Sequence, residues 1–202
     1  LLFQAQIDSI NILQPAAVSA VTSDERSPFT HTNFDAQELN SRDAGQDLPF
    51  LLRLAPSVVV TSDAGNGIGY TGMRIRGTDA SRINVTINGV PLNDAESQGV
   101  YWVDLPDLGA SVSGLQIQRG VGTSTVGPGA FGGSVAVNTL GSIVKPRVKA
   151  VLGMGSFNSY RQSVSWNTGM IGEGISFEGR ASHISSDGYI DRASSELSSL
   201  YT

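Results

Sequence analysis

The side chains best suited to catalysis or metal binding are scattered carboxylates and two histidines. Five acidic residues stand in predicted loops: Asp63, Asp94, Glu96, Asp104 and Asp107. The run from Asp63 to Asn66 lacks the alternating acidic ligands of a calcium loop, and His31 and His183 stand far apart, outside any metal-ligand spacing. The chain has neither cysteine nor a Gly-x-Ser-x-Gly motif, so the two commonest nucleophile arrangements are absent. We therefore predict no catalytic residue, no metal site and no cofactor.

Two glycine-rich polar loops combine aromatic rings with hydrogen-bonding groups. They cover residues 62–70 and 93–102 and carry Tyr70, Tyr101 and Trp102. Loops of this composition often contact ligands. The alternative is that these rings pack beneath their own loops. For Trp102, which is flanked by valines, both interpretations stay open.

Composition excludes several partners. The 202 residues include 24 glycines and 15% charged residues, which suits a turn-rich β protein. The net charge of -5 and a pI near 4.9 argue against nucleic acid, because the 13 basic residues are not clustered. No apolar run is long enough for a membrane-spanning helix. The N-terminus lacks the features of a signal peptide, so we expect a processed or trimmed chain.

The elements that must position these residues are short. Apolar spacing predicts a helix over residues 46–54, with Pro49 in its first turn. Asn88-Gly89 is a strong hairpin turn signal. Strands are predicted at Val58–Val60, Met73–Arg76, Ile83–Ile87, Leu115–Arg119 and Ser134–Thr139, with one short strand around Ala16–Val21 in an irregular lead-in. Together they predict a small mixed sheet with one or two helices.

The last third of the chain alternates apolar and polar residues in segments of about ten residues. We predict antiparallel strands over residues 148–184, turning at Gly172-Glu173-Gly174. Leu152, Trp166 and Phe177 should share one outward face, with Ser165 and Glu178 on the other. A barrel with lipid outside and water inside requires this pattern, although a soluble meander on an apolar core would produce it too.

Three motifs in order carry a family resemblance. They are Met73-Arg74-Ile75-Arg76-Gly77, the segment from Ile83 to Asp94 with its Asn-Gly turn before Val-Pro-Leu, and the glycine-rich closing segment within residues 112–139. A phosphate-binding loop is disfavoured there, because Pro128 stands where such a loop needs lysine. The chain resembles the plug domain of a TonB-dependent outer-membrane transporter. Residues 94–107 further resemble iron-complex receptors of Bacteroidetes.

The resemblance implies an α+β plug with a small mixed sheet, followed by antiparallel transmembrane β-barrel strands of an incomplete barrel. It implies an N-terminal extended or coupling segment at residues 1–33, a plug domain at 34–144 and first barrel strands at 145–202. The expected location is the outer membrane of a Gram-negative bacterium. The expected partners are the periplasmic C-terminal domain of TonB, outer-membrane lipid, a small-molecule cargo such as an iron complex, and the rest of a barrel of about 22 strands in the same or another chain. Leu13–Val21 stands where a coupling peptide could lie but departs from a clear consensus.

The resemblance also assigns roles to residues. Burying an arginine without a partner is costly, and the family's arginines at matching positions face carboxylates on the inner barrel wall. This makes Arg74, Arg76 and Arg119 plug-to-barrel docking residues, with solvated strand edges as the alternative. The residues of the two loops that would face cargo at the plug apex are Asn66, Tyr70, Asp94, Glu96, Gln98, Tyr101 and Trp102.

Two other functions remain open from the sequence. The chain could be a plug-like subunit or stopper that fills a pore formed by another chain without transporting anything. An enzyme of the glycosidase type is far less favoured, and survives only because scattered carboxylates can meet in space. The favoured function is a binding and gating module that catalyses no covalent chemistry.

Overall fold

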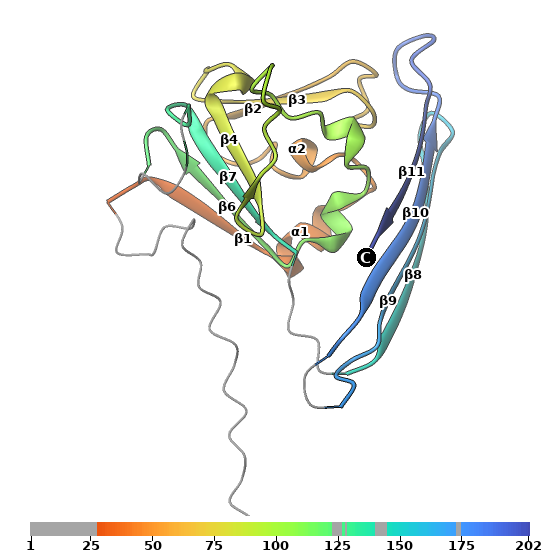
Figure 1. The fold of residues 1–202 in the computed structure, drawn as a ribbon. Coiled ribbons are helices and arrows are strands. Elements are labelled where there is room, and N and C mark those ends of the chain that lie inside the picture. The colour runs from red at the N-terminus through yellow and green to blue at the C-terminus, as the bar shows by residue number, and fades with distance from the viewer. Residues whose placement is uncertain (1–27, 123–126, 128, 140–144, 173–174) are drawn as a thin grey trace, which may run out of the picture.

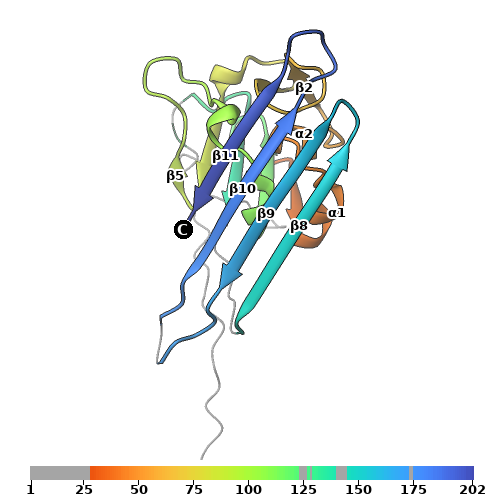
Figure 2. The same ribbon diagram turned by 90° about the vertical axis from the view of Figure 1, so that its right-hand side faces the viewer.

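An α+β domain and a separate four-stranded sheet lie face to face in this protein (Figures 1 and 2). The computed structural model describes residues 28–122, 127, 129–139, 145–172 and 175–202. The predicted strand around Ala16–Val21, the coupling stretch Leu13–Val21, much of the glycine-rich turn and residues 173–174 of the last predicted turn lie outside the described residues. Among the described residues, no helix is long and apolar enough to span a bilayer.

The α+β domain is built on a five-stranded mixed sheet in the order β1-β6-β7-β4-β5. Its strands are β1 His31–Asp35, β4 Ile83–Ile87, β5 Val90–Pro91, β6 Gly114–Arg119 and β7 Gly133–Asn138. Strands β4 and β7 pair in parallel, and the other pairs are antiparallel. Strand β1 was not predicted, and the predicted boundary between residues 33 and 34 falls inside it.

The predicted Asn-Gly turn is confirmed. Asn88 and Gly89 both have positive φ, of 50° and 83°, as a type I′ hairpin turn requires. The Asn88 amide also exchanges two hydrogen bonds with Thr139, through Nδ2 to Oγ1 at 2.8 Å and from the Thr139 amide to Oδ1 at 2.9 Å. The turn therefore also fixes the end of β7.

Two strands expected in the central sheet form a sheet of their own. β2 Val58–Ser62 pairs with β3 Thr71–Ile75 as an isolated antiparallel hairpin. The prediction of one sheet was wrong here, because alternation identifies a strand without identifying its partner. The hairpin still packs on the shared core, where the side chains of Ile75, Ile117 and Val135 are fully buried. Each such side chain contributes about 1.5–3 kcal/mol.

Two short helices pack against this core. The predicted helix over 46–54 is confirmed in shorter form as α2 Leu48–Leu51, with Pro49 in its first turn. Helix α1 Ala36–Arg42 was missed, although Asp35 caps it by accepting from the Glu38 amide at 2.7 Å. Single-turn 3-10 helices follow at η1 Ala80–Arg82, η2 Trp102–Asp104 and η3 Leu108–Ser111.

The four-stranded sheet, called the outer sheet below, is antiparallel in the order β11-β10-β9-β8. It consists of β8 Arg147–Gly155, β9 Ser159–Asn167, β10 Glu178–Ser186 and an additional strand, β11 Ser195–Tyr201. Val148 pairs with Trp166 on the face away from the α+β domain, where Leu152 is 82% exposed. Phe177 is also exposed but precedes β10. Ser165 and Glu178 stand opposite the buried Arg180 and Asn167 in the register and so face the α+β domain, which confirms the predicted alternation.

Candidate functional site

A buried cluster of four charged side chains joins the outer sheet to the α+β domain. Its members, called the ion cluster below, are Asp43, Asp107, Arg161 and Arg180. Arg161 Nη2 lies 2.7 Å from Asp43 Oδ2 and 2.5 Å from Asp107 Oδ1, and Arg180 Nη1 lies 2.8 Å from Asp107 Oδ2. All four side chains are at most 7% exposed, and that of Asp107 is fully buried.

Local backbone structure places the two carboxylates. Asp43 is the C-cap of α1, and its amide donates to the Asn40 carbonyl at 3.4 Å. Asp107 precedes η3 in the left-handed region, with φ 59° and ψ 21°, a conformation that Asp and Asn adopt more readily than most residues. Strand alternation turns Arg161 and Arg180 inward. The cluster thus joins two loops of one domain to two strands of the other.

The cluster is neutral as a whole, with two guanidinium groups and two carboxylates. Neither oxygen of Asp107 makes a hydrogen bond of good geometry with another described residue, and the two arginines supply its compensating charge. Arg180 also donates from Nε to Ser111 Oγ at 2.8 Å and from Nη1 to Ser182 Oγ at 3.0 Å. Removing one partner from a buried pair typically costs 3–5 kcal/mol, because it leaves the other charge uncompensated.

A second attachment joins the β2–β3 loop, residues 63–70, to the β10–β11 loop, residues 187–194. The Ala64 carbonyl accepts from the amides of Tyr189 at 2.9 Å and Ile190 at 3.3 Å. Asn66 Nδ2 donates to Ser186 Oγ at 2.8 Å. Both loops lie at the same end of the molecule, the upper end in Figure 1. The α+β domain is therefore held to the outer sheet at two levels.

The segment between Asp43 and Asp47 links these two attachments. Gln46 Nε2 donates to the Asn66 carbonyl at 2.6 Å, and the Asp47 amide donates to the Gly67 carbonyl at 2.8 Å. Asp47 is buried and accepts from Thr71 Oγ1 at 2.8 Å. Burial raises the pKa of Asp47 from 3.8 to about 7, against hydrogen bonds from Thr71 and the Gly69 backbone that lower it.

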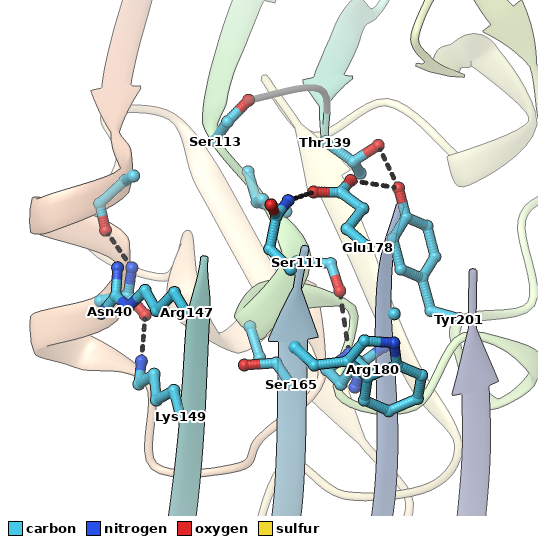
Figure 3. Close-up of a pocket in the computed structure, with 16 residues that line it drawn as sticks. Asn40, Ser111, Ser113, Thr139, Arg147, Lys149, Ser165, Glu178, Arg180 and Tyr201 are labelled. Atoms are coloured by element: carbon cyan, nitrogen blue, oxygen red, sulfur yellow. Dashed lines mark hydrogen bonds between the residues drawn. The ribbon is translucent and has the colours of Figure 1, made fainter. Parts of the chain in front are cut away.

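A cavity of about 230 Å³ lies beside the ion cluster, between the outer sheet and the α+β domain (Figure 3). Arg180 belongs to both. Tyr201 bridges the cavity by donating to Thr139 Oγ1 at 3.0 Å. Lys149 Nζ donates to Asn40 Oδ1 at 3.4 Å. No group of three or more His, Asp or Glu side chains in the described part of the chain could hold a metal ion.

Most of the predicted apical residues are exposed in the structure. Tyr70 is 64% exposed and Tyr101 is 53% exposed. Asp94 accepts from the amides of Ser97 at 2.7 Å and Glu96 at 3.1 Å, and these bonds, Ser97 first, lower its pKa. Gln98 is exposed and donates to the Ala95 carbonyl at 2.9 Å. Cargo binding by these residues stays a prediction.

Two predicted apical residues lie in other settings. Trp102 is only 4% exposed and belongs to the hydrophobic core, so the alternative of packing beneath its own loop is the one observed. The flanking valines were the signal for this burial. Asn66 uses its side chain amide to reach Ser186, so it fastens the β2–β3 loop to the outer sheet.

The three predicted docking arginines do not pair with acids among the described residues. Arg119 donates from Nη1 to Thr32 Oγ1 at 2.6 Å and thereby holds β1, and Arg74 and Arg76 are exposed. Their docking role stays a prediction. Sequence reasoning missed Arg161 and Arg180. The available signal was that both stand at inward-facing positions in the alternating pattern of their strands.

Comparison with known proteins supplies a family and a set of similar folds. Residues 23–134 match the family model for the TonB-dependent Receptor Plug Domain. Among solved structures, FpvA of P. aeruginosa bound to a heterologous iron pyoverdine has a TM-score of 0.65 and 16% identity, with 80% of this chain and 21% of that chain covered. The alcaligin outer-membrane receptor FauA of Bordetella pertussis has a TM-score of 0.64 and 17% identity, with 82% and 28% covered.

The copper transporter OprC has a TM-score of 0.65 and 20% identity, with 84% of this chain and 26% of that chain covered. The chain thus spans only 21% to 28% of the length of these three structures. No curated protein matches the sequence.

Proposed function

Because the chain belongs to the family of TonB-dependent receptor plug domains, we propose that it supplies the plug and the first wall strands of an active outer-membrane transporter. It belongs to the outer membrane of a Gram-negative bacterium. Residues 34–144 would be the plug and residues 145–202 the wall, with residues 1–33 as a lead-in that couples to TonB. The module would bind and gate, with no covalent chemistry.

The observation that carries this proposal is the ion cluster. A plug that closes a lumen must be held firmly and yet be released on demand. Buried ion pairs meet both needs, because they hold only while they are desolvated and well aligned. When a displacement lets water reach Asp107 and Arg161, both charges become hydrated and their attraction weakens. The ion cluster would thus hold the plug to the outer sheet and release it once water enters the cluster.

The chain order suggests how a pull from the N-terminal side would reach the ion cluster. Strand β1 lies at the edge of the five-stranded sheet, and helix α1 follows it directly. Asp43, at the end of α1, is the first cluster member along the chain. We infer that displacement of β1 and α1 by TonB would separate Asp43 from Arg161 before it reaches Asp107.

The cargo site would lie at the upper end of the plug, on Tyr70, Tyr101, Asp94, Glu96 and Gln98. FpvA is described with an iron pyoverdine and OprC as a copper transporter. We propose an iron complex as the cargo. The β2–β3 loop would connect this site to the ion cluster, because it is hydrogen-bonded to both Gln46 and Asp47.

The alternative is a stopper that fills a pore without transporting anything. The test is uptake of a radioactive iron chelate by cells that depend on the receptor carrying this chain, with and without a protonophore. Active transport predicts accumulation that stops when the proton gradient collapses. If no chelate accumulates under any condition while the pore remains closed, the stopper is supported instead.

A further inference from the structure

Two exposed cations line the cavity between the outer sheet and the α+β domain and have no carboxylate partner among the described residues. Arg147 and Lys149 lie two residues apart on the inner face of β8, where they pair with Asn167 and Ser165 of β9 and line the cavity. Within the part of the chain that the structure describes, no ion pair joins either of them to an acidic residue. Lys149 donates instead to the neutral amide oxygen of Asn40.

The other charged groups of the cavity have partners. Arg180 is paired with Asp107 in the ion cluster. Glu178 stands opposite Asn167 in the β9–β10 register, on the side away from Arg147, and its carboxylate lies 3.4 Å from Asn167 Nδ2 and 3.5 Å from the Tyr201 hydroxyl oxygen. Glu178 is therefore the carboxylate on the β10 side of the cavity, whereas Arg147 and Lys149 are the charged groups on its β8 side (Figure 3).

Two serine hydroxyl groups also line the cavity. Ser165 stands opposite Lys149 in the β8–β9 register, and Ser111 lines the cavity from η3. A serine hydroxyl donates as well as accepts, so these groups can satisfy anion oxygens that the cations leave free. The volume of about 230 Å³ exceeds that needed for single waters and admits a small solute.

We propose that this cavity binds a small dicarboxylate. Residues two apart on a strand have backbones about 6.5 Å apart along it, and the long side chains of Arg147 and Lys149 both reach the cavity, so each cation can meet one carboxylate of the same small molecule. The planar guanidinium of Arg147 suits a carboxylate in bidentate contact, and the Lys149 ammonium suits the second carboxylate as a point charge. The site differs from the proposed cargo site at the upper end and does not depend on transport.

The test is calorimetric titration of the purified receptor that carries this chain with succinate at low ionic strength, where charge interactions are least screened. We expect Arg147→Gln combined with Lys149→Gln to weaken succinate binding at least about tenfold. Acetate, with one carboxylate, should bind markedly more weakly than succinate. Exchanging the cations as Arg147→Lys with Lys149→Arg should retain most of the affinity.

Arg192→Gln is the matched control, because Arg192 is an exposed arginine in the β10–β11 loop and its loss changes the net charge without touching the cavity. It should leave succinate binding unchanged. Wild-type receptor that binds no succinate at millimolar concentration would overturn the proposal. So would equal affinity in the doubly neutralised variant, or equal binding of acetate and succinate.

Discussion

Arg161 in the outer sheet and Asp107 in the α+β domain form a buried ion pair, with Nη2 and Oδ1 2.5 Å apart. Asp43 approaches the same guanidinium nitrogen from another loop, and Arg180 approaches the second oxygen of Asp107. The two residues at the centre of the cluster therefore each have two partners, so a change at either one disturbs both sides of the contact.

Gly45→Ala should loosen this contact. A Cβ at Gly45, where φ is 84°, would lie 2.8 Å from Arg161 Cδ, and Arg161 cannot move aside without leaving its carboxylates. We expect a loss of about 2–4 kcal/mol, from backbone strain and a disturbed ion pair. Gly77→Ala is the control, because φ at Gly77 is 74° and no atom of the described residues lies within 4 Å of where the new Cβ would be. Equal melting temperatures for the two variant receptors would contradict the close packing of Arg161.

Asp47 should make the stability of the β2–β3 loop depend on pH. Its pKa is raised to about 7, so the folded state holds a proton that the unfolded state has released between pH 3.8 and about 7. Stability is therefore greatest at acidic pH and falls as pH rises through this range. Asp47→Asn should remove the fall and gain on the order of 2–4 kcal/mol at pH 8.

Hydrogen exchange at the amides of residues 66–71, between pH 5 and pH 8, measures this effect once intrinsic rates are corrected. Asp79→Asn is the control, because backbone and side-chain hydrogen bonds from Ser81 lower the pKa of Asp79 and keep it charged throughout. Wild-type protection that does not decline with pH would show that Asp47 is charged across the whole range.

Leu152→Arg should impair membrane assembly. Leu152 is 82% exposed on the face of the outer sheet away from the α+β domain, where the proposal places lipid. An arginine there costs about 2–4 kcal/mol near the bilayer midplane. Thermal unfolding in lipid vesicles should show the loss, while Glu196→Arg at the exposed start of β11 should change stability less. Unchanged stability of Leu152→Arg would place this face in water.

Arg119→Ala should free the edge strand β1. Its Nη1 donates to Thr32 Oγ1 at 2.6 Å, and loss of a hydrogen bond with a charged donor costs about 1.5–3 kcal/mol. Protease cleavage within residues 31–35 should become faster than in wild type.

If Arg119 and Arg76 also dock against other wall strands, alanine at both positions should let small solutes pass through the receptor. If the receptor with alanine at both positions transports normally and admits no extra solute, the docking role is wrong and the contact with β1 is the role that remains for Arg119.

The sequence predicts elements here better than it predicts contacts. Alternation located β4, β6 and β7 to within one residue and assigned Leu152 and Trp166 to the correct face, because strand periodicity is a local property. Pairing is a tertiary property, so the separation of β2 and β3 from the main sheet could not be read from it. The ion cluster was missed for the same reason, since Arg161 meets Asp107 only once two domains pack. The charges are also placed the opposite way from the expected docking contact. The arginines lie on the outer sheet and the acids on the α+β domain, whereas arginines were expected on the plug and acids on the wall.

The central claim is that the ion cluster holds a transporter plug in place, and Asp107→Asn tests it most directly. Asparagine keeps the shape and tolerates the left-handed backbone at this position, but leaves Arg161 and Arg180 undercompensated. The measurement is passive entry of a small hydrophilic solute into lipid vesicles that contain the receptor carrying this chain, with Glu96→Gln as an exposed acidic control. The account predicts faster entry through Asp107→Asn than through wild type or the control. Equal, negligible entry through all three would contradict it.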